Sequence, residues 1–184
     1  MNTVPDMKFI AVAATSLDGF ITRGNEPGTA FTSRADKEWF SKAMKSFPVK
    51  IVGRKTFDES KDAILEQVAK ESSDLRLVLT RSPGTYEQWQ TSERLEFINT
   101  TPSGLAERIG KSQHWDSDIA VLGGGAVYSA FLQSGLLDEF WITLEPQLFG
   151  RGTPIVIDRA EQLLELKETI QLGPSTLLLK YRCG

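Results

Sequence analysis

Histidine and cysteine are almost absent from this sequence. Its 184 residues include one histidine, His114, and one cysteine, Cys183. A single cysteine cannot form an internal disulfide, and a structural zinc site needs three or four ligands, so we expect no bound metal. A Ser-His-Asp or Cys-His mechanism would depend on His114, whose polar neighbours do not resemble a catalytic site. An enzyme of this composition would use a carboxylate, lysine or tyrosine for proton transfer, or a cofactor for the difficult step.

A strong charge of one sign and long apolar runs are also missing. The chain has 21 Lys and Arg against 24 Asp and Glu, a net charge of −3, so it lacks the basic excess of a nucleic-acid or anionic-membrane binder. The longest apolar run near the N-terminus covers residues 9–14 and is too short for a signal core or a membrane-spanning helix. No feature indicates an oxidising compartment, and we expect a cytoplasmic protein.

The remaining composition is that of a globular domain, with 40% hydrophobic and 24% charged residues. A chain of this length buries about 70% of the surface that it exposes when unfolded, which is enough for one real core. We therefore expect a single domain over residues 7–184, preceded by an N-terminal extension over residues 1–6.

Apolar blocks alternate with amphipathic blocks along the chain. The apolar blocks predict strands at 9–14, 49–52, 75–79, 97–98, 119–122 and 140–144. The amphipathic blocks predict helices at 35–46, 57–70, 103–111 and 126–134. This order predicts an α/β fold with a mostly parallel sheet and flanking helices. Further strands expected at 155–157, 163–172 and 176–182, with few helical signals between them, predict an antiparallel edge.

Two glycine-containing turns join an expected strand to an expected helix. Residues 123–125 are three glycines between AVL and AVYSAFL, where a ligand can approach the backbone and a helix N-terminus favours an anion; a plain tight turn fits as well. Gly53 is followed by Arg54, Lys55 and Thr56, and cations at a helix start indicate either an anionic partner or a solvated pair. Two such turns on neighbouring strands can flank one phosphorylated ligand. The donor-rich residues 80–82, at another strand end, fit a further phosphate or an ordinary turn.

Asp36 is the candidate proton carrier. It follows the capping sequence Thr32-Ser33-Arg34 in the first turn of an expected helix, where an acid usually just stabilises the helix dipole. Phe40 lies one turn further on the same face. If that face lines an apolar pocket, burial raises the pKa of the carboxyl toward a value suited to proton transfer.

Six segments in this order resemble the dihydrofolate reductase-like superfamily. They are AVAATSLDGFIT, SRADKEWF, VGRKTF, LVLTRSP, VLGGGAVYSAF and LDEFWITLEPQLFGRGTP, and together they extend from about residue 7 to 182. The superfamily includes dihydrofolate reductases and the C-terminal reductase domain of the bifunctional deaminase-reductase of riboflavin biosynthesis. The resemblance implies a three-layer fold and an NADPH-dependent oxidoreductase that transfers a hydride.

The resemblance also implies roles for particular residues. Asp36 would be the active-site carboxylate, supported by Thr143 and Tyr128, and substrate would contact Ala13, Asp36 and Phe40. Asp18 and Gly19 would begin a mobile loop over the site. The residues that would bind NADPH are Ala14, Gly53, Arg54, Lys55, Thr56, Thr80, Arg81, Ser82, Gly123, Gly124, Gly125, Ala126, Val127 and Tyr128. Members of the superfamily often have a cis Gly-Gly peptide at this turn.

Several departures from the superfamily pattern affect the expected substrate. Asp74 stands where dihydrofolate reductases have an arginine for the folate carboxylate, although Arg76 is close. Ala126 replaces an arginine for the extra phosphate of NADPH, which leaves this task to Arg81 or Lys55 and makes NADH a plausible alternative. Leu122 replaces a glutamate common in the riboflavin-type reductases, and the chain contains no deaminase domain.

We therefore expect a reductase of a nitrogen heterocycle or its ribosylamine derivative, with 5-amino-6-(5-phosphoribosylamino)uracil as the first substrate. Dihydrofolate reduction is the alternative from the same superfamily, and nucleotide binding without turnover is an alternative from another class. The expected partner is a small-molecule substrate, with no nucleic acid or membrane. The riboflavin-type reductases are commonly homodimers, and the apolar segment 140–144 near the C-terminal edge fits a dimer interface or a buried strand of a monomer.

Overall fold

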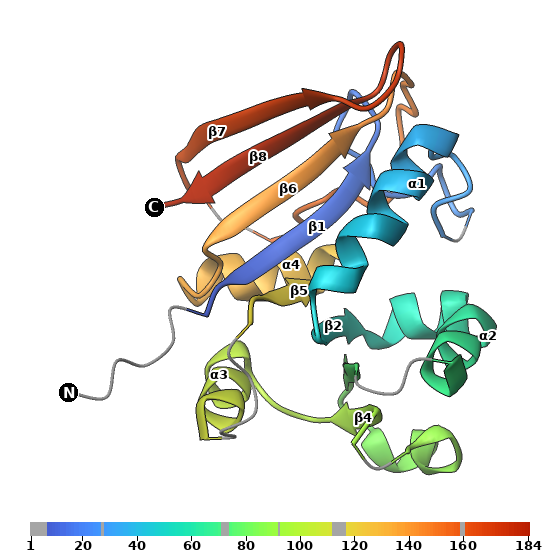
Figure 1. The fold of residues 1–184 in the computed structure, drawn as a ribbon, viewed down its shortest axis with the longest axis vertical. Helices are drawn as coiled ribbons and strands as arrows, with labels where there is room; N and C mark the ends of the chain where they lie inside the picture. Colours follow the sequence, from blue (N-terminus) through green and yellow to red (C-terminus); the bar gives the residue numbers. More distant parts are fainter. Residues whose placement is uncertain (1–6, 27, 71–73, 92, 112–116, 159–160) are drawn as a thin grey trace.

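The computed structural model describes residues 7–26, 28–70, 74–91, 93–111, 117–158 and 161–184. The predicted extension over residues 1–6 and His114 lie outside this part of the chain. Eight strands form one sheet in the order β4-β3-β2-β5-β1-β6-β8-β7 (Figure 1). In chain order the strands are β1 Phe9–Thr15, β2 Val49–Gly53, β3 Leu75–Leu79, β4 Leu95–Ile98, β5 Ile119–Val121, β6 Glu139–Leu144, β7 Leu164–Gln171 and β8 Leu177–Cys183.

The sheet has a parallel part and an antiparallel edge, as predicted. The strands from β4 to β6 pair in parallel, with Ala13 of β1 opposite Ile142 of β6 and Ile51 of β2 opposite Val121 of β5. β8 then pairs antiparallel with β6 on one side and with β7 on the other. The carboxyl ends of the parallel strands consequently lie along one edge of the sheet, which is where α/β proteins bind their ligands.

In the described part of the chain, four α-helices cover the two faces of the sheet and complete three layers (Figure 1). The helices are α1 Arg34–Ala43, α2 Arg54–Lys70, α3 Pro102–Lys111 and α4 Gly125–Gln133. Trp39 of α1 and Phe57 of α2 pack on one face, against Val12 and Val52 among others. Phe131 of α4 packs on the opposite face together with Leu105 and Ile109 of α3. Successive strand residues supply the two faces, because side chains alternate along a strand.

One sequence expectation about the C-terminal part is wrong. Residues 155–157 form no strand: the N–H of Ile155 donates to the Gly19 carbonyl, and that of Ile157 donates to the Ser129 hydroxyl. The apolar run is instead a loop segment, in which Ile155 packs against the core. The segment 140–144 lies in β6, which is interior because it pairs with β1 and β8, so it offers no free sheet edge to a second copy.

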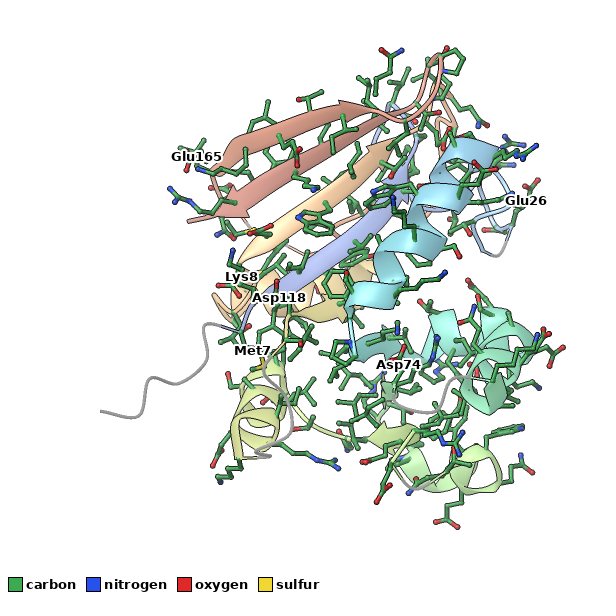
Figure 2. All side chains as sticks on the ribbon, viewed as in Figure 1. Met7, Lys8, Glu26, Asp74, Asp118 and Glu165 are labelled. Atoms are coloured by element: carbon green, nitrogen blue, oxygen red, sulfur yellow. The ribbon has the colours of Figure 1, made fainter. Side chains whose placement is uncertain are left out.

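Polar contacts hold the amino end of the sheet, opposite the glycine turns. The N–H groups of Lys8 and Phe9 donate to the carboxylates of Asp118 and Asp138 at 3.1 and 2.8 Å. The Lys8 ammonium also pairs with Glu139 at 2.8 Å, and Figure 2 shows Lys8 and Asp118 together at this end. The described residues contain no helix long and apolar enough to cross a membrane.

Candidate active site

The two predicted glycine turns touch at the carboxyl edge of the sheet. The N–H of Gly53 donates to the Gly123 carbonyl at 2.6 Å. A Cβ on Gly53 would lie 2.9 Å from Val127 Cγ2, and a Cβ on Gly123, which has φ +89°, would lie 2.7 Å from the Tyr128 ring. Larger residues would therefore separate the turns. The Gly123–Gly124 peptide bond is cis, as the resemblance implies.

Helix starts at this edge suit a phosphorylated cofactor. α2 begins at Arg54, directly after β2, and no side chain caps the N-terminus of α4 at Gly124. Two helix N-termini that begin on paired strands present backbone N–H groups and positive dipole ends to one anionic ligand. Gly124 and Thr56 line the neighbouring cleft, so the two helix N-termini are open toward the side where the substrate would lie. The residues present therefore fit a dinucleotide that approaches along this edge.

The predicted phosphate contacts divide into two groups. Arg54 forms an ion pair with Asp58 at 3.0 Å, and Lys55 is exposed beside it at the start of α2. Thr80, Arg81 and Ser82 follow β3, the next strand along the edge, with Arg81 and Ser82 exposed. Ala126 is exposed in the first turn of α4, whereas Val127 is buried in the core.

A cleft of about 430 Å³ runs from this edge along the sheet between α1 and α2. Ala13 and Ala14 of β1 line it, as do Asp36 and Phe40 of α1. The structure therefore brings the predicted substrate residues together beside Gly124. A ligand in the cleft would have the carboxyl of Asp36 on one side and the glycine turns on the other.

Asp36 is buried at the start of α1, with 6% of its surface exposed. Its N–H donates to the hydroxyl of Ser33 at 3.2 Å, which confirms the predicted cap. Burial raises the pKa of the Asp36 carboxyl, and the negative charge of Glu145 raises it further. The hydroxyls of Thr143 and Thr32 and the charge of Lys37 lower it, but the net pKa is still raised.

The two threonine hydroxyls beside Asp36 are themselves buried. Each approaches the carboxyl closely enough to affect its pKa, yet neither makes a hydrogen bond of full geometry with a described residue. Both hydroxyls are therefore able to donate a hydrogen bond to the Asp36 carboxyl. The sequence pointed to Thr143 through the resemblance, whereas Thr32 stood out only as part of a capping sequence.

The hydroxyl of Tyr128 is engaged by the fold. It donates to the Val12 carbonyl at 2.7 Å, and complete burial raises the pKa of the phenol. The ring lies beneath Gly123 and also lines the cleft. Contact of Tyr128 with a bound ligand would therefore come from the ring, while its hydroxyl holds β1 to α4.

The inner end of the cleft is polar. Lys50 of β2 is 2% exposed, and its ammonium donates to the Phe47 carbonyl at 2.8 Å and contacts the carboxylate of Asp74 (labelled in Figure 2). The neighbouring guanidinium of Arg76 donates to Gln67 at 2.6 Å. Asp74 therefore faces a cation, which offsets its negative charge. Lys50 gave no signal, because it is a single cation inside an apolar strand.

The loop over the site is fastened to a second loop. The carboxylate of Asp18 accepts hydrogen bonds from Ser16 at 2.6 Å and from the N–H groups of Phe149 and Gly150 at 3.1 and 2.7 Å. The hydrogen bond from Ser16 and those backbone donors lower the pKa of Asp18 to about 2. Further along, the N–H of Gly24 donates to the Arg151 carbonyl at 3.0 Å. We name residues 16–24 and 147–154 the paired loops.

Other proteins are similar to this chain in sequence or in fold. The protein YwjB of Bacillus subtilis (strain 168), which is uncharacterised, is 29% identical over 179 residues, or 94% of this chain and 97% of that protein. A pyrimidine reductase-like protein from Corynebacterium diphtheriae superposes with a TM-score of 0.75 at 16% identity, over 98% of this chain and 93% of that one.

Two further structures with the same fold are those of reductases. The diaminohydroxyphosphoribosylaminopyrimidine deaminase/5-amino-6-(5-phosphoribosylamino)uracil reductase of Thermotoga maritima gives a TM-score of 0.71 at 16% identity, over 97% of this chain and 57% of that one. The dihydrofolate reductase of Enterococcus faecalis, in complex with NADP(H), gives 0.59 at 17% identity, over 96% of each chain.

The family comparison covers nearly the whole sheet. The model of the RibD C-terminal domain matches residues 7–178, from the start of β1 into β8. The parallel strands, β7 and the two glycine turns all lie within this match. The chain therefore belongs to the RibD C-terminal domain family.

Proposed function

We propose that this protein is an NADPH-dependent reductase of a pyrimidine ribosylamine, of the 5-amino-6-(5-phosphoribosylamino)uracil reductase type. The observation that carries the proposal is the cleft itself, in which a buried carboxyl faces the two helix starts across one cavity. Family membership and the solved reductases of the same fold support it. When bound, NADPH would supply the hydride.

The chain's own residues would supply position and a proton. Thr56 and Gly124 would hold the phosphate-bearing part of the cofactor at the edge, and Ala13 and Ala14 leave space beside β1 for a flat ring. Asp36 would hold a proton at its carboxyl oxygen and donate it to the nitrogen or oxygen next to the reduced carbon. The apolar walls from α1 and α2 would keep water away from that carboxyl.

Dihydrofolate is a second candidate substrate, because cations at the inner end of the cleft suit an anionic group. Lys50 and Arg76 lie there with Asp74, so the site can offset the charge of a carboxylate-bearing substrate. The arrangement of Asp36 and Phe40 in α1 fits both candidates. A nucleotide-binding role without turnover would leave the burial of Asp36 without a purpose.

The test measures cofactor binding and turnover separately. NADPH and NADH are titrated against tryptophan fluorescence, and NADPH oxidation is then followed with each of the two substrates. We expect tighter binding of NADPH and faster oxidation with the pyrimidine ribosylamine. Binding without oxidation of NADPH would exclude the reductase, and faster turnover of dihydrofolate would reverse the substrate assignment.

A homodimer and a cytoplasmic location also remain proposals. β7, the outer strand of the antiparallel edge, carries charged residues that include Glu165 and Lys167. Such residues discourage edge-to-edge pairing, so a dimer would have to use a sheet face or a loop. Sedimentation of the purified protein over a range of concentrations measures the association.

A further inference from the structure

A second buried carboxyl lies behind Asp36, and the proposed reaction does not use it. Glu145 follows the last residue of β6 and is 1% exposed. Its Oε1 accepts hydrogen bonds from both the N–H and the hydroxyl of Ser33, each at 2.9 Å. Its Oε2 lies 3.2 Å from the hydroxyl of Thr176, which can donate to it. These hydrogen bonds satisfy the buried carboxyl and give it a fixed position in the fold.

These contacts join three elements at one point. Ser33 caps α1, the helix that carries Asp36, and Thr176 immediately precedes β8. The Thr176 hydroxyl also lies 3.1 Å from that of Ser33, and a Cβ on Gly173 would lie 3.2 Å from Ala35. The turn between β7 and β8 therefore packs against the first turn of α1, with Glu145 between them. Movement of Glu145 would move the residue that caps the helix of Asp36.

The surroundings of the two carboxyls differ in kind. Glu145 is surrounded by N–H and O–H donors, which suit an ionised carboxylate. Within the described ranges, no cation forms an ion pair with it, so its negative charge is not cancelled locally. Near Asp36, by contrast, the hydroxyls of Thr32 and Thr143 form no hydrogen bond of full geometry, and burial and the charge of Glu145 both disfavour its ionised form. Paired acids with contrasting environments take different protonation states.

We propose that Glu145 is a positioning residue whose ionised carboxylate fixes the start of α1 and makes Asp36 the member of the pair that holds a proton. This inference deepens the proposed reductase function and rests on it for the use of that proton. The charged groups that act on Asp36 are Glu145 from the end of β6 and Lys37 from α1 itself. Lys37 acts in the opposite direction and is exposed, so solvent screens it more strongly.

The test follows the titration of the Asp36 carboxyl by NMR in the full chain without cofactor or substrate. The carboxyl carbons are labelled with carbon-13, and the Asp36 signal is assigned by its loss in Asp36→Asn. In Glu145→Gln, which removes the charge and keeps the size, we expect the Asp36 midpoint to move to lower pH. In Glu145→Asp, which keeps a charge, we expect it to stay closer to that of the unmodified protein.

A matched control lies on the same strand. Glu139→Gln removes a carboxylate from the opposite end of β6, where Glu139 pairs with Lys8, and should leave the Asp36 midpoint unchanged. An unchanged Asp36 midpoint in Glu145→Gln overturns the proposal. Equal shifts in Glu145→Gln and Glu145→Asp overturn it too, because they would show a packing effect and not a charge effect.

Turnover provides the second readout. The protonated form of Asp36 would be active, so the rate should fall as pH rises through its midpoint, and this fall should move to lower pH in Glu145→Gln. An absence of NADPH oxidation in the unmodified protein would reject the proposed function and leave the carboxyl titrations unaffected. Normal oxidation together with an unmoved Asp36 midpoint in Glu145→Gln would reject only the role of Glu145.

Discussion

The fold holds the Asp36 carboxyl in a buried position that disfavours its charged form. Burial raises the pKa of the group above its ordinary value. Between the ordinary and the raised value, the folded chain binds more protons than the unfolded chain, so stability falls as pH rises through this window. A site that needs a protonated acid thus loses stability toward neutral pH.

Asp36→Asn separates this loss of stability from catalysis. The amide keeps the shape and has no charge, so we expect the variant to unfold at a higher temperature than the unmodified protein near neutral pH. The two melting temperatures should converge as pH falls through the window. Turnover should drop by about 100-fold or more, since a positioned proton donor contributes at least that factor, while NADPH affinity should change little. Calorimetry at two pH values, with the NADPH assays, checks each part, and undiminished turnover would remove Asp36 from the mechanism.

At the scale of elements, glycine turns and helix starts determine how the edge is built. Gly125, the first residue of α4, lies against the end of the second paired loop and the residues after it, because a Cβ there would be 2.6 Å from the Pro154 carbonyl and 2.8 Å from Ile157 Cγ2. The absence of a side chain lets α4 start close to that loop. The N-terminus of α4, which would face a phosphate, is therefore held by the hydrogen bond between Gly53 and Gly123 and by the contact of Gly125 with the loop.

Gly125→Ala should consequently destabilise the protein. Forcing a methyl group into this contact costs about 1–3 kcal/mol of unfolding free energy, and the shift of α4 should weaken NADPH binding. Gly110→Ala is the matched control, since Gly110 lies in α3 and a methyl group added there would meet only open space. There the exchange should stabilise the protein by about 0.5–1 kcal/mol. Urea unfolding of both variants measures the contrast, and equal effects would argue against the packing explanation.

Elements that depend on a local run of apolar residues could mostly be predicted from the sequence, whereas contacts between distant segments could not. Continuous apolar runs predicted the strands from β1 to β6 because parallel strands are covered on both faces. The run at 155–157 has the same composition but packs as a loop, since its N–H groups bond to Gly19 and Ser129 and not to a strand. Short apolar runs do not distinguish these outcomes. Lys50 acquires its position only when distant segments meet, so no local pattern indicated its contacts.

At the scale of the whole molecule, the paired loops join segments about 130 positions apart. Asp18 accepts hydrogen bonds from the backbone of Phe149 and Gly150, and Phe20 forms a bridge with Pro154. Ile21 and Thr22 of the first loop also line the cleft. The first of the paired loops, which covers the site, is therefore held in place by the second, which follows β6.

The Asp18 carboxylate makes this attachment dependent on pH. Because its folded pKa is lowered to about 2 from an ordinary 3.8, its contribution is present above the ordinary value and is lost as pH falls toward 2. Asp18→Asn should imitate the acid state at neutral pH, with faster amide hydrogen exchange at Phe149 and Gly150. Exchange in β1 should stay as it is in the unmodified protein. Equal acceleration in both places would indicate general unfolding instead.

The order of the antiparallel strands has a consequence for synthesis. β8 lies between β6 and β7, yet it follows both in the chain. While the polypeptide is still growing, β7 therefore has no neighbour to join, and the outer edge of β6 stays unpaired until β8 emerges. Thr176, which contacts Glu145, arrives just before that strand. A ribosome that stalls or stops before β8 would thus release a chain with an open, aggregation-prone edge and an unfinished cap on the helix of Asp36.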